Sequence, residues 1–309
     1  MQLRQMLGVS LLSSVVLLGA SMATAQGAPG GYSADGYAQA GVSWDGSEWG
    51  SYALGKGWLD VPFPGGDWVP GMGLELSFSG LSTGTGQASV IFPAFYFGVA
   101  NTRVNLGLPQ SAFERGGFRR DMAAPYGPVG LELDVFLRGS YATMAQYSDI
   151  YSPGVRVDGK IGDLDASASY LYDTTSGVRS IAVSARYGNM GGVSILSAAE
   201  VATDGVSSMN SYFLGVEKDG GPMRYGLQYG SSMFVGGEYA SGYVEYTVSD
   251  RLTAGATGMM LIGSPDYMVG VDARYDLGDF SLNGSYLTGG VLANDTGVFM
   301  ANFAIGMDF

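Results

Sequence analysis

The stretch that decides the fold is residues 298–309, which reads VFMANFAIGMDF. Its alternate positions are apolar, namely Phe299, Ala301, Phe303, Ile305, Met307 and Phe309. Because successive side chains of a strand point to opposite faces, this pattern predicts a strand with one apolar face and one mostly small or polar face. A strand whose apolar face meets lipid, and whose last ring lies at the headgroup boundary, has this pattern. The alternative is an edge strand of a soluble domain, so the other segments have to decide.

Segments of about ten residues with the same alternation recur along the chain. We predict strands at 37–44, 52–61, 72–80, 88–99, 103–108, 151–157, 164–172, 181–187, 193–201, 212–217, 223–229, 240–248, 251–257, 267–276, 280–286 and 298–309. Segment 52–61 fits worst, because either parity puts Lys56 or several glycines on the apolar face. The count of sixteen is even, as a bacterial barrel with both termini on one side requires.

The polar faces of these segments carry few long charged side chains, and tyrosines lie near the segment ends. A soluble sandwich would need fewer strands and would expose more lysine, glutamate and threonine. We therefore predict an all-β fold, a transmembrane antiparallel up-and-down β-barrel that faces lipid outside and water inside. About 16 strands would enclose an aqueous channel rather than a packed core. Residues 109–149 interrupt the pattern, and a segment of this length is usually functional or disordered.

Composition narrows the function. Arg4, the apolar run 7–18 and the triplet Ala23-Thr24-Ala25 predict a secretory signal peptide at 1–25, which leaves one domain at 26–309. A retained anchor is disfavoured because the apolar run is short. The chain has no cysteine and no histidine, which removes disulfides and the usual base of hydrolases. Its net charge of −13 argues against nucleic acid. We predict no catalytic site, no metal site and no cofactor.

Three stretches resemble bacterial outer-membrane porins, specifically the trimeric general-diffusion porins of photosynthetic purple bacteria. They are the ending at Phe309, ARYDLGDFSLNGSY at 273–286, and ASVIFPAFYFGVANTRVNLGLP at 88–109. The resemblance implies that the loop after the fifth strand, 109–149, folds into the lumen as the constriction. It also implies a homotrimer in the outer membrane, in contact with lipid and lipopolysaccharide, with short periplasmic turns and longer outer loops.

Charged residues give candidate pore positions. In the family the constriction loop is mainly acidic, whereas here it mixes Glu114, Asp121, Glu132 and Asp134 with Arg115, Arg119, Arg120 and Arg138. The predicted outer loops carry Asp45, Glu48, Asp173, Asp204, Glu238, Asp266 and Asp295. Inward arginines beside the predicted periplasmic turns are Arg103, Arg156, Arg186, Arg224, Arg251 and Arg274. This predicts an acidic mouth, which concentrates cations, and a basic collar, which tempers large anions.

Each charge pattern has a plainer alternative. The outer carboxylates could bind divalent cations between lipopolysaccharides, and the collar could pair with turn carboxylates such as Asp158, Glu217, Asp250 and Asp276. The leading function is a channel for passive diffusion of small hydrophilic solutes and ions, with weak cation preference. A sugar-selective porin is the alternative, weakened because inward aromatics such as Phe213 and Tyr243 are scattered. A barrel enzyme or a structural barrel ranks lower still.

Overall fold

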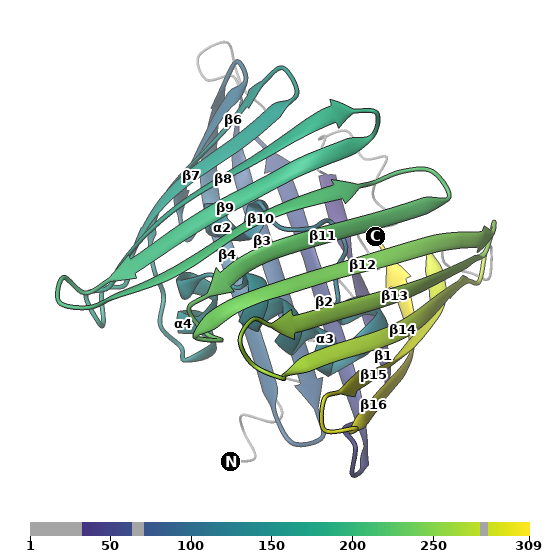
Figure 1. The fold of residues 1–309 in the computed structure, drawn as a ribbon. Helices are drawn as coiled ribbons and strands as arrows, with labels where there is room; N and C mark the ends of the chain where they lie inside the picture. The colour runs from purple at the N-terminus through teal and green to yellow at the C-terminus, as the bar shows by residue number, and fades with distance from the viewer. Residues whose placement is uncertain (1–32, 64–70, 279–283) are drawn as a thin grey trace.

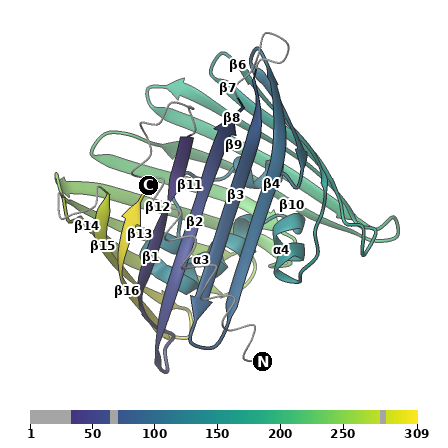
Figure 2. The ribbon, with the colours of Figure 1, turned by 180° about the vertical axis from the view of Figure 1, so that it is seen from behind.

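The computed structural model describes residues 33–63, 71–278 and 284–309. They form a closed barrel of sixteen strands (Figures 1 and 2). The strands are β1 Ser33–Trp44, β2 Trp49–Pro62, β3 Met72–Thr83, β4 Gln87–Val99, β5 Thr102–Gly107, β6 Gly154–Ile161, β7 Leu164–Tyr172, β8 Arg179–Met190, β9 Val193–Thr203, β10 Ser208–Lys218, β11 Met223–Ser232, β12 Gly237–Ser249, β13 Leu252–Leu261, β14 Tyr267–Asp276, β15 Ser285–Asn294 and β16 Phe299–Asp308. The predicted signal peptide, 1–25, lies outside the described residues and stays a prediction.

Every strand runs antiparallel to both of its neighbours, and the first and last strands close the barrel. β16 pairs with β1 from Tyr37 opposite Asp308 to Trp44 opposite Ala301. The N–H and C=O of Phe309 also bond Gly36, which completes the seam at 3.0 and 3.1 Å. Closure satisfies the backbone groups that an open edge would leave unpaired in lipid. The predicted fold class and strand number are confirmed.

The alternation works as expected in β16. Phe303 and Ile305 point outward, with 57% and 54% of their surface exposed, whereas Asn302 and Ala304 point inward and are buried. The same parity places Leu214 and Leu227 outside, and Phe213 and Gln228 inside. The outer surface is therefore an apolar band, and the polar side chains line the interior.

Two predicted strands were displaced. Segment 280–286 lies mostly outside the described residues, which omit 279–283, and β15, Ser285–Asn294, continues beyond its end. Its alternation is blurred by Gly289 and Gly290, and a Cβ at Gly290 would lie 2.7 Å from the ring of Tyr126. Segment 151–157 was also set too early, because β6 is Gly154–Ile161. In both cases the strand continues beyond the residues that carry the clearest period.

The connections differ in length between the two ends of the barrel. At the end away from Phe309, the turns that join β1 to β2 and each later pair except β5 and β6 are three to six residues long. At the Phe309 end, four connections have only two residues each, namely β4–β5, β6–β7, β8–β9 and β12–β13, so the turns at the other end are longer than these, and the segment between β5 and β6 is much longer. The expected acid Glu238 is not a loop residue, since it belongs to β12.

The segment between β5 and β6 is helical and lies inside the barrel (Figure 1). It contains α2 Ala112–Arg115, α3 Ala123–Arg138 and α4 Tyr141–Tyr147. α2 and α4 begin at the serine caps Ser111 and Ser140, whose hydroxyls accept a backbone N–H. α3 is broken at Gly127, whose φ of +57° favours glycine, and Pro128 follows it. Among the described residues, no helix has the length and apolar content needed to span a bilayer.

Candidate functional site

A cavity of about 570 Å³ remains inside the barrel, between the wall strands β1–β4 and the inserted segment 109–149. The wall side contributes Asp35, Tyr37, Lys56, Trp58, Ser77, Ser79, Val90 and Phe92. The segment contributes Gln110, Glu114, Arg115, Phe118, Arg119, Arg120, Asp121, Asp134, Arg138, Thr143 and Tyr147. Polar and charged groups line both sides, as an aqueous passage requires. The inserted segment therefore forms one wall of this cavity.

The first anchor of the segment is Arg120, on the wall formed by β12–β14. Its guanidinium donates to Glu245 at 2.9 Å, to Asp272 at 2.6 Å and to the hydroxyl of Thr257. Tyr126 of α3 donates to the same Asp272 at 2.8 Å. Burial alone would lower the pKa of Arg120, but Asp272 and Glu245 raise it above its ordinary value. The buried arginine is thus held as a cation between two carboxylates.

The second anchor joins the segment to β2. The Lys56 ammonium lies 2.5 Å from Asp121 and 3.8 Å from Asp134. Asp134 is itself paired with Arg138 one turn later in α3. Burial would raise the pKa of Asp121, yet Lys56 outweighs it and the pKa is lowered. Four predicted charges of the segment are therefore accounted for by two anchors.

The third anchor is on β8–β10. Glu217 accepts from the Arg119 backbone N–H at 2.9 Å and from Arg186 at 2.7 Å, and Arg186 also donates to the carbonyl of Gly117. The side chain of Arg119 reaches Asp219 at 2.6 Å.

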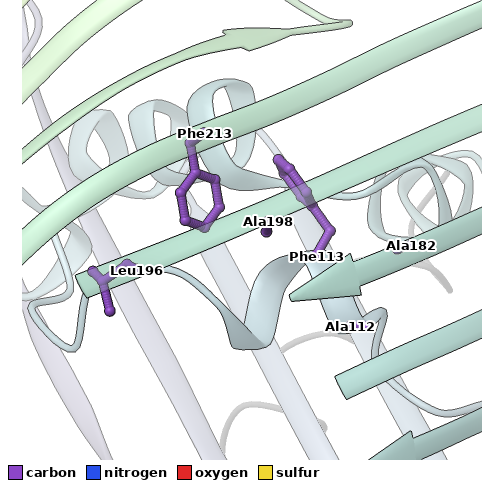
Figure 3. Packing of buried hydrophobic residues seen from close by; sticks show 6 residues of the cluster. All are labelled: Ala112, Phe113, Ala182, Leu196, Ala198 and Phe213. Atoms are coloured by element: carbon purple, nitrogen blue, oxygen red, sulfur yellow. The ribbon is translucent and has the colours of Figure 1, made fainter. Parts of the chain in front are cut away.

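Beside this anchor, α2 packs on the wall through apolar side chains. Phe113 meets Phe213 edge to face at a centroid distance of 5.4 Å, over Ala182, Leu196 and Ala198 (Figure 3). Such a contact stabilises beyond the area it buries. The predicted inward aromatic Phe213 is thus a packing residue and does not face the cavity.

The predicted arginine collar is largely neutralised on the wall itself. Arg103 contacts Asp60 at 2.5 Å and Glu75 at 3.0 Å. The fully buried Arg156 contacts Glu75 at 2.8 Å and Asp158 at 3.0 Å. The sequence left open that these inward arginines pair with nearby carboxylates. Arg103 and Arg156 do so.

The other predicted residues are spread out. Arg274 pairs with Asp308 at 2.6 Å, and Arg224 comes only within 4.0 Å of Asp219. Glu114 accepts from Gln110 and from the backbone N–H of Ser140, so it fixes the start of α4. Glu132 is exposed on α3 and does not line the cavity. Arg115 lines the cavity.

Several lining residues escaped the sequence prediction. Asp35, Tyr37 and Trp58 line the cavity from β1 and β2. Asp35 precedes the predicted strand 37–44, because β1 begins at Ser33, and Trp58 lies in 52–61, the least certain predicted strand, so no pore role was assigned to either. Lys56 interrupted the apolar alternation of 52–61 because it is an inward-facing cation that pairs with Asp121 of the segment.

The acids predicted at the outer mouth serve turn geometry. Asp45 accepts from the N–H of Ser47 and Glu48, and these bonds lower its pKa to about 2. Asp204 does the same for Val206 and Ser207, so its pKa is lowered as well. In the described ranges, no three acidic residues come together as a metal site. The suggested divalent cation binding stays a prediction.

Comparison with solved structures decides what kind of barrel this is. A double-substituted variant of the porin of Rhodopseudomonas blastica superposes with a TM-score of 0.64 at 17% identity, over 90% of this chain and 100% of that one. A triple-substituted variant of the same porin gives 0.63 at 17% identity with the same coverage. This chain has the porin fold. No family model matches the sequence, and no curated protein matches it. At this identity, the likeness extends to the fold alone.

Proposed function

We propose that this porin-fold chain is an outer-membrane channel through which small hydrophilic solutes and ions diffuse passively. The observation that carries the proposal is the cavity with charged side chains on both sides that is left between β1–β4 and the anchored segment of a closed barrel. Diffusion through it needs no chemistry, in keeping with a chain that has no histidine. The segment 109–149 acts as the constriction, and its three anchors keep the passage at a fixed width.

The charges support weak cation preference. Inside the barrel, nearly every arginine already faces a carboxylate, whereas the mouth acids Asp45, Asp204, Asp266 and Asp295 form no ion pair among the described residues. Their field concentrates cations at the entrance, and salt screens it over a Debye length of about 8 Å at 0.15 M. Reversal potentials in a salt gradient would measure this, and clear anion preference would contradict it.

The distribution of exposed tyrosines around the outer surface of the barrel supports insertion as a homotrimer. Within the described strands, the exposed tyrosines all belong to β7–β14, namely Tyr170, Tyr172, Tyr187, Tyr212, Tyr229, Tyr246, Tyr267 and Tyr275. Tyrosine girdles mark the arc that meets lipid headgroups. The remaining arc exposes phenylalanines such as Phe95 and Phe303 instead. An arc without tyrosine suits contact with other copies, and the opposite arc suits lipid and lipopolysaccharide.

The test of the constriction is liposome swelling with sugars of graded size. Removal of 123–138, which form α3, deletes the part of the segment that packs on β14–β16, β1 and β2. We expect the barrel to fold, as judged by its circular dichroism, and the size cut-off to rise. An unchanged cut-off would contradict the proposed constriction.

A sugar-selective channel is the second candidate. It is favoured by the aromatic rings of Tyr37, Trp58, Phe118 and Tyr147 around the cavity. Conductance that falls saturably when a sugar is added would support it, whereas conductance insensitive to sugars would favour general diffusion.

A further inference from the structure

We propose that Arg115 is an anion-binding site inside the pore that holds the carboxylate of a passing solute. The inference deepens the proposed channel function and rests on it, since a solute reaches this side chain only through an open lumen. It assigns a solute class, small carboxylates, that the overall acidic charge of the chain does not suggest.

Arg115 differs from the other arginines of the inserted segment. Arg119 and Arg120 each have a carboxylate within 2.9 Å, and Arg138 is paired with Asp134. Among the described residues, Arg115 forms one ion pair, with Asp158, whose carboxylate lies 3.8 Å from its Nε. Within the part of the chain that the structure describes, no acceptor forms a hydrogen bond with its guanidinium. Its five N–H donors are therefore available.

The one nearby carboxylate is already occupied. Asp158 accepts from Arg156 Nε at 3.0 Å, from Asn105 at 2.8 Å and from the Ser167 hydroxyl. Glu114, next in sequence to Arg115, accepts from Gln110 at 2.8 Å, from the Ser140 N–H at 2.7 Å and from the Thr143 hydroxyl. Both carboxylates are therefore hydrogen-bonded by other groups, and Asp158 makes only a long ion pair of 3.8 Å with Arg115.

The side chain faces the lumen. Arg115 lines the cavity, and 36% of its side-chain surface is exposed. Desolvation by the surrounding barrel and the guanidinium of Arg156 lower its pKa, and an arginine stays protonated at neutral pH nonetheless. Its planar donor fork fits a carboxylate through two parallel hydrogen bonds, which are stronger and more directional than those of a lysine. This is the chemistry that selects a carboxylate over chloride.

The test uses the full-length protein in planar bilayers with potassium chloride, and succinate as the probe. Succinamide has the same length without charge, so it controls for simple obstruction. We expect succinate to reduce the conductance saturably and succinamide to have little effect. In Arg115→Gln the half-blocking concentration of succinate should rise by at least about tenfold, because a charge-assisted pair is lost. Arg115→Lys should fall between the two, because it keeps the charge without the fork.

Arg119→Gln is the matched control, since its side chain also lines the cavity but already binds Asp219, and the substitution keeps the backbone N–H bond to Glu217 that belongs to the third anchor. It should leave the half-blocking concentration within about twofold of the wild type. The inference is overturned if the channel conducts potassium chloride but the half-blocking concentration of succinate is the same in Arg115→Gln as in the wild type. It is also overturned if succinate reduces the wild-type conductance no more than succinamide does. A wild-type protein that conducts no potassium chloride would instead overturn the channel function itself, so the two failures are distinct.

Discussion

Arg120→Met should loosen the inserted segment without opening the barrel. The side chain of Arg120 is 5% exposed and that of Asp272 is 8% exposed, so the ion pair between them is buried. Removal of one partner of a buried pair costs about 3–5 kcal/mol, because the other charge is left uncompensated. Since the side chain of Glu245 is 19% exposed to solvent, we take the lower end of this cost, about 3 kcal/mol. At about 1.4 kcal/mol per tenfold, the segment should leave its anchored position roughly a hundredfold more often.

Single-channel recording measures this effect, because each departure of the segment changes the width of the passage. We expect Arg120→Met to increase open-channel noise and the frequency of sublevels, and to expose 109–149 to protease in the folded barrel. Arg119→Met is the control, since its side chain is 61% exposed and an exposed pair contributes about 0–1 kcal/mol. Wild-type noise and protease resistance in Arg120→Met would refute the view that this anchor holds the constriction.

Two further predictions concern acid and lipid. The Asp121–Lys56 anchor depends on an aspartate whose pKa is lowered below 3.8, so the ion pair is complete above pH 3.8 and is lost as the pH falls below that value. Channel noise of the wild type should therefore rise below pH 3.8. Asp121→Asn should show the same raised noise already at neutral pH. The prediction is ruled out if wild-type noise is the same at neutral pH and below pH 3.8 and Asp121→Asn is no noisier than the wild type at neutral pH. Leu227→Arg puts a charge on the lipid face, where Leu227 is 64% exposed, and should destabilise the barrel by about 2–4 kcal/mol in urea unfolding from liposomes. Asp35→Arg, inside the lumen, should change unfolding by less than about 1 kcal/mol, and equal effects at the two sites would contradict the assigned faces.

The fold could be predicted because a two-residue period is a local signal. Each strand of the barrel has one face in lipid, so Phe303 and Ile305 alternate with Asn302 and Ala304 whatever the neighbouring strands are. The two-residue period was least clear where the inner face meets the inserted segment, although the predicted strand 52–61 lies within β2. There Leu54 and Tyr52 are buried against Ala123 and Leu131, so the inner face becomes apolar too and the period fades.

The site could be predicted only in outline. The sequence indicates which residues are charged, but the partner of each depends on where a helical segment lies inside the barrel. Arg120 binds Glu245 and Asp272, which lie more than a hundred residues later in the sequence, and no local sequence pattern predicts that pairing. Arg115 is similar to Arg119 and Arg120 in sequence, but among the described residues its one ion-pair partner, Asp158, lies 3.8 Å away and forms no hydrogen bond with it.

The most direct test of a water-filled passage beside β1–β4 is the reactivity of single cysteines, for which the cysteine-free chain is already suited. Asp35→Cys puts a thiol in the lining of the cavity, and Leu227→Cys puts one on the lipid face. A membrane-impermeant methanethiosulfonate reagent, added during recording, should lower the conductance of Asp35→Cys and leave that of Leu227→Cys unchanged. An inert Asp35→Cys channel that still conducts potassium chloride would contradict the account.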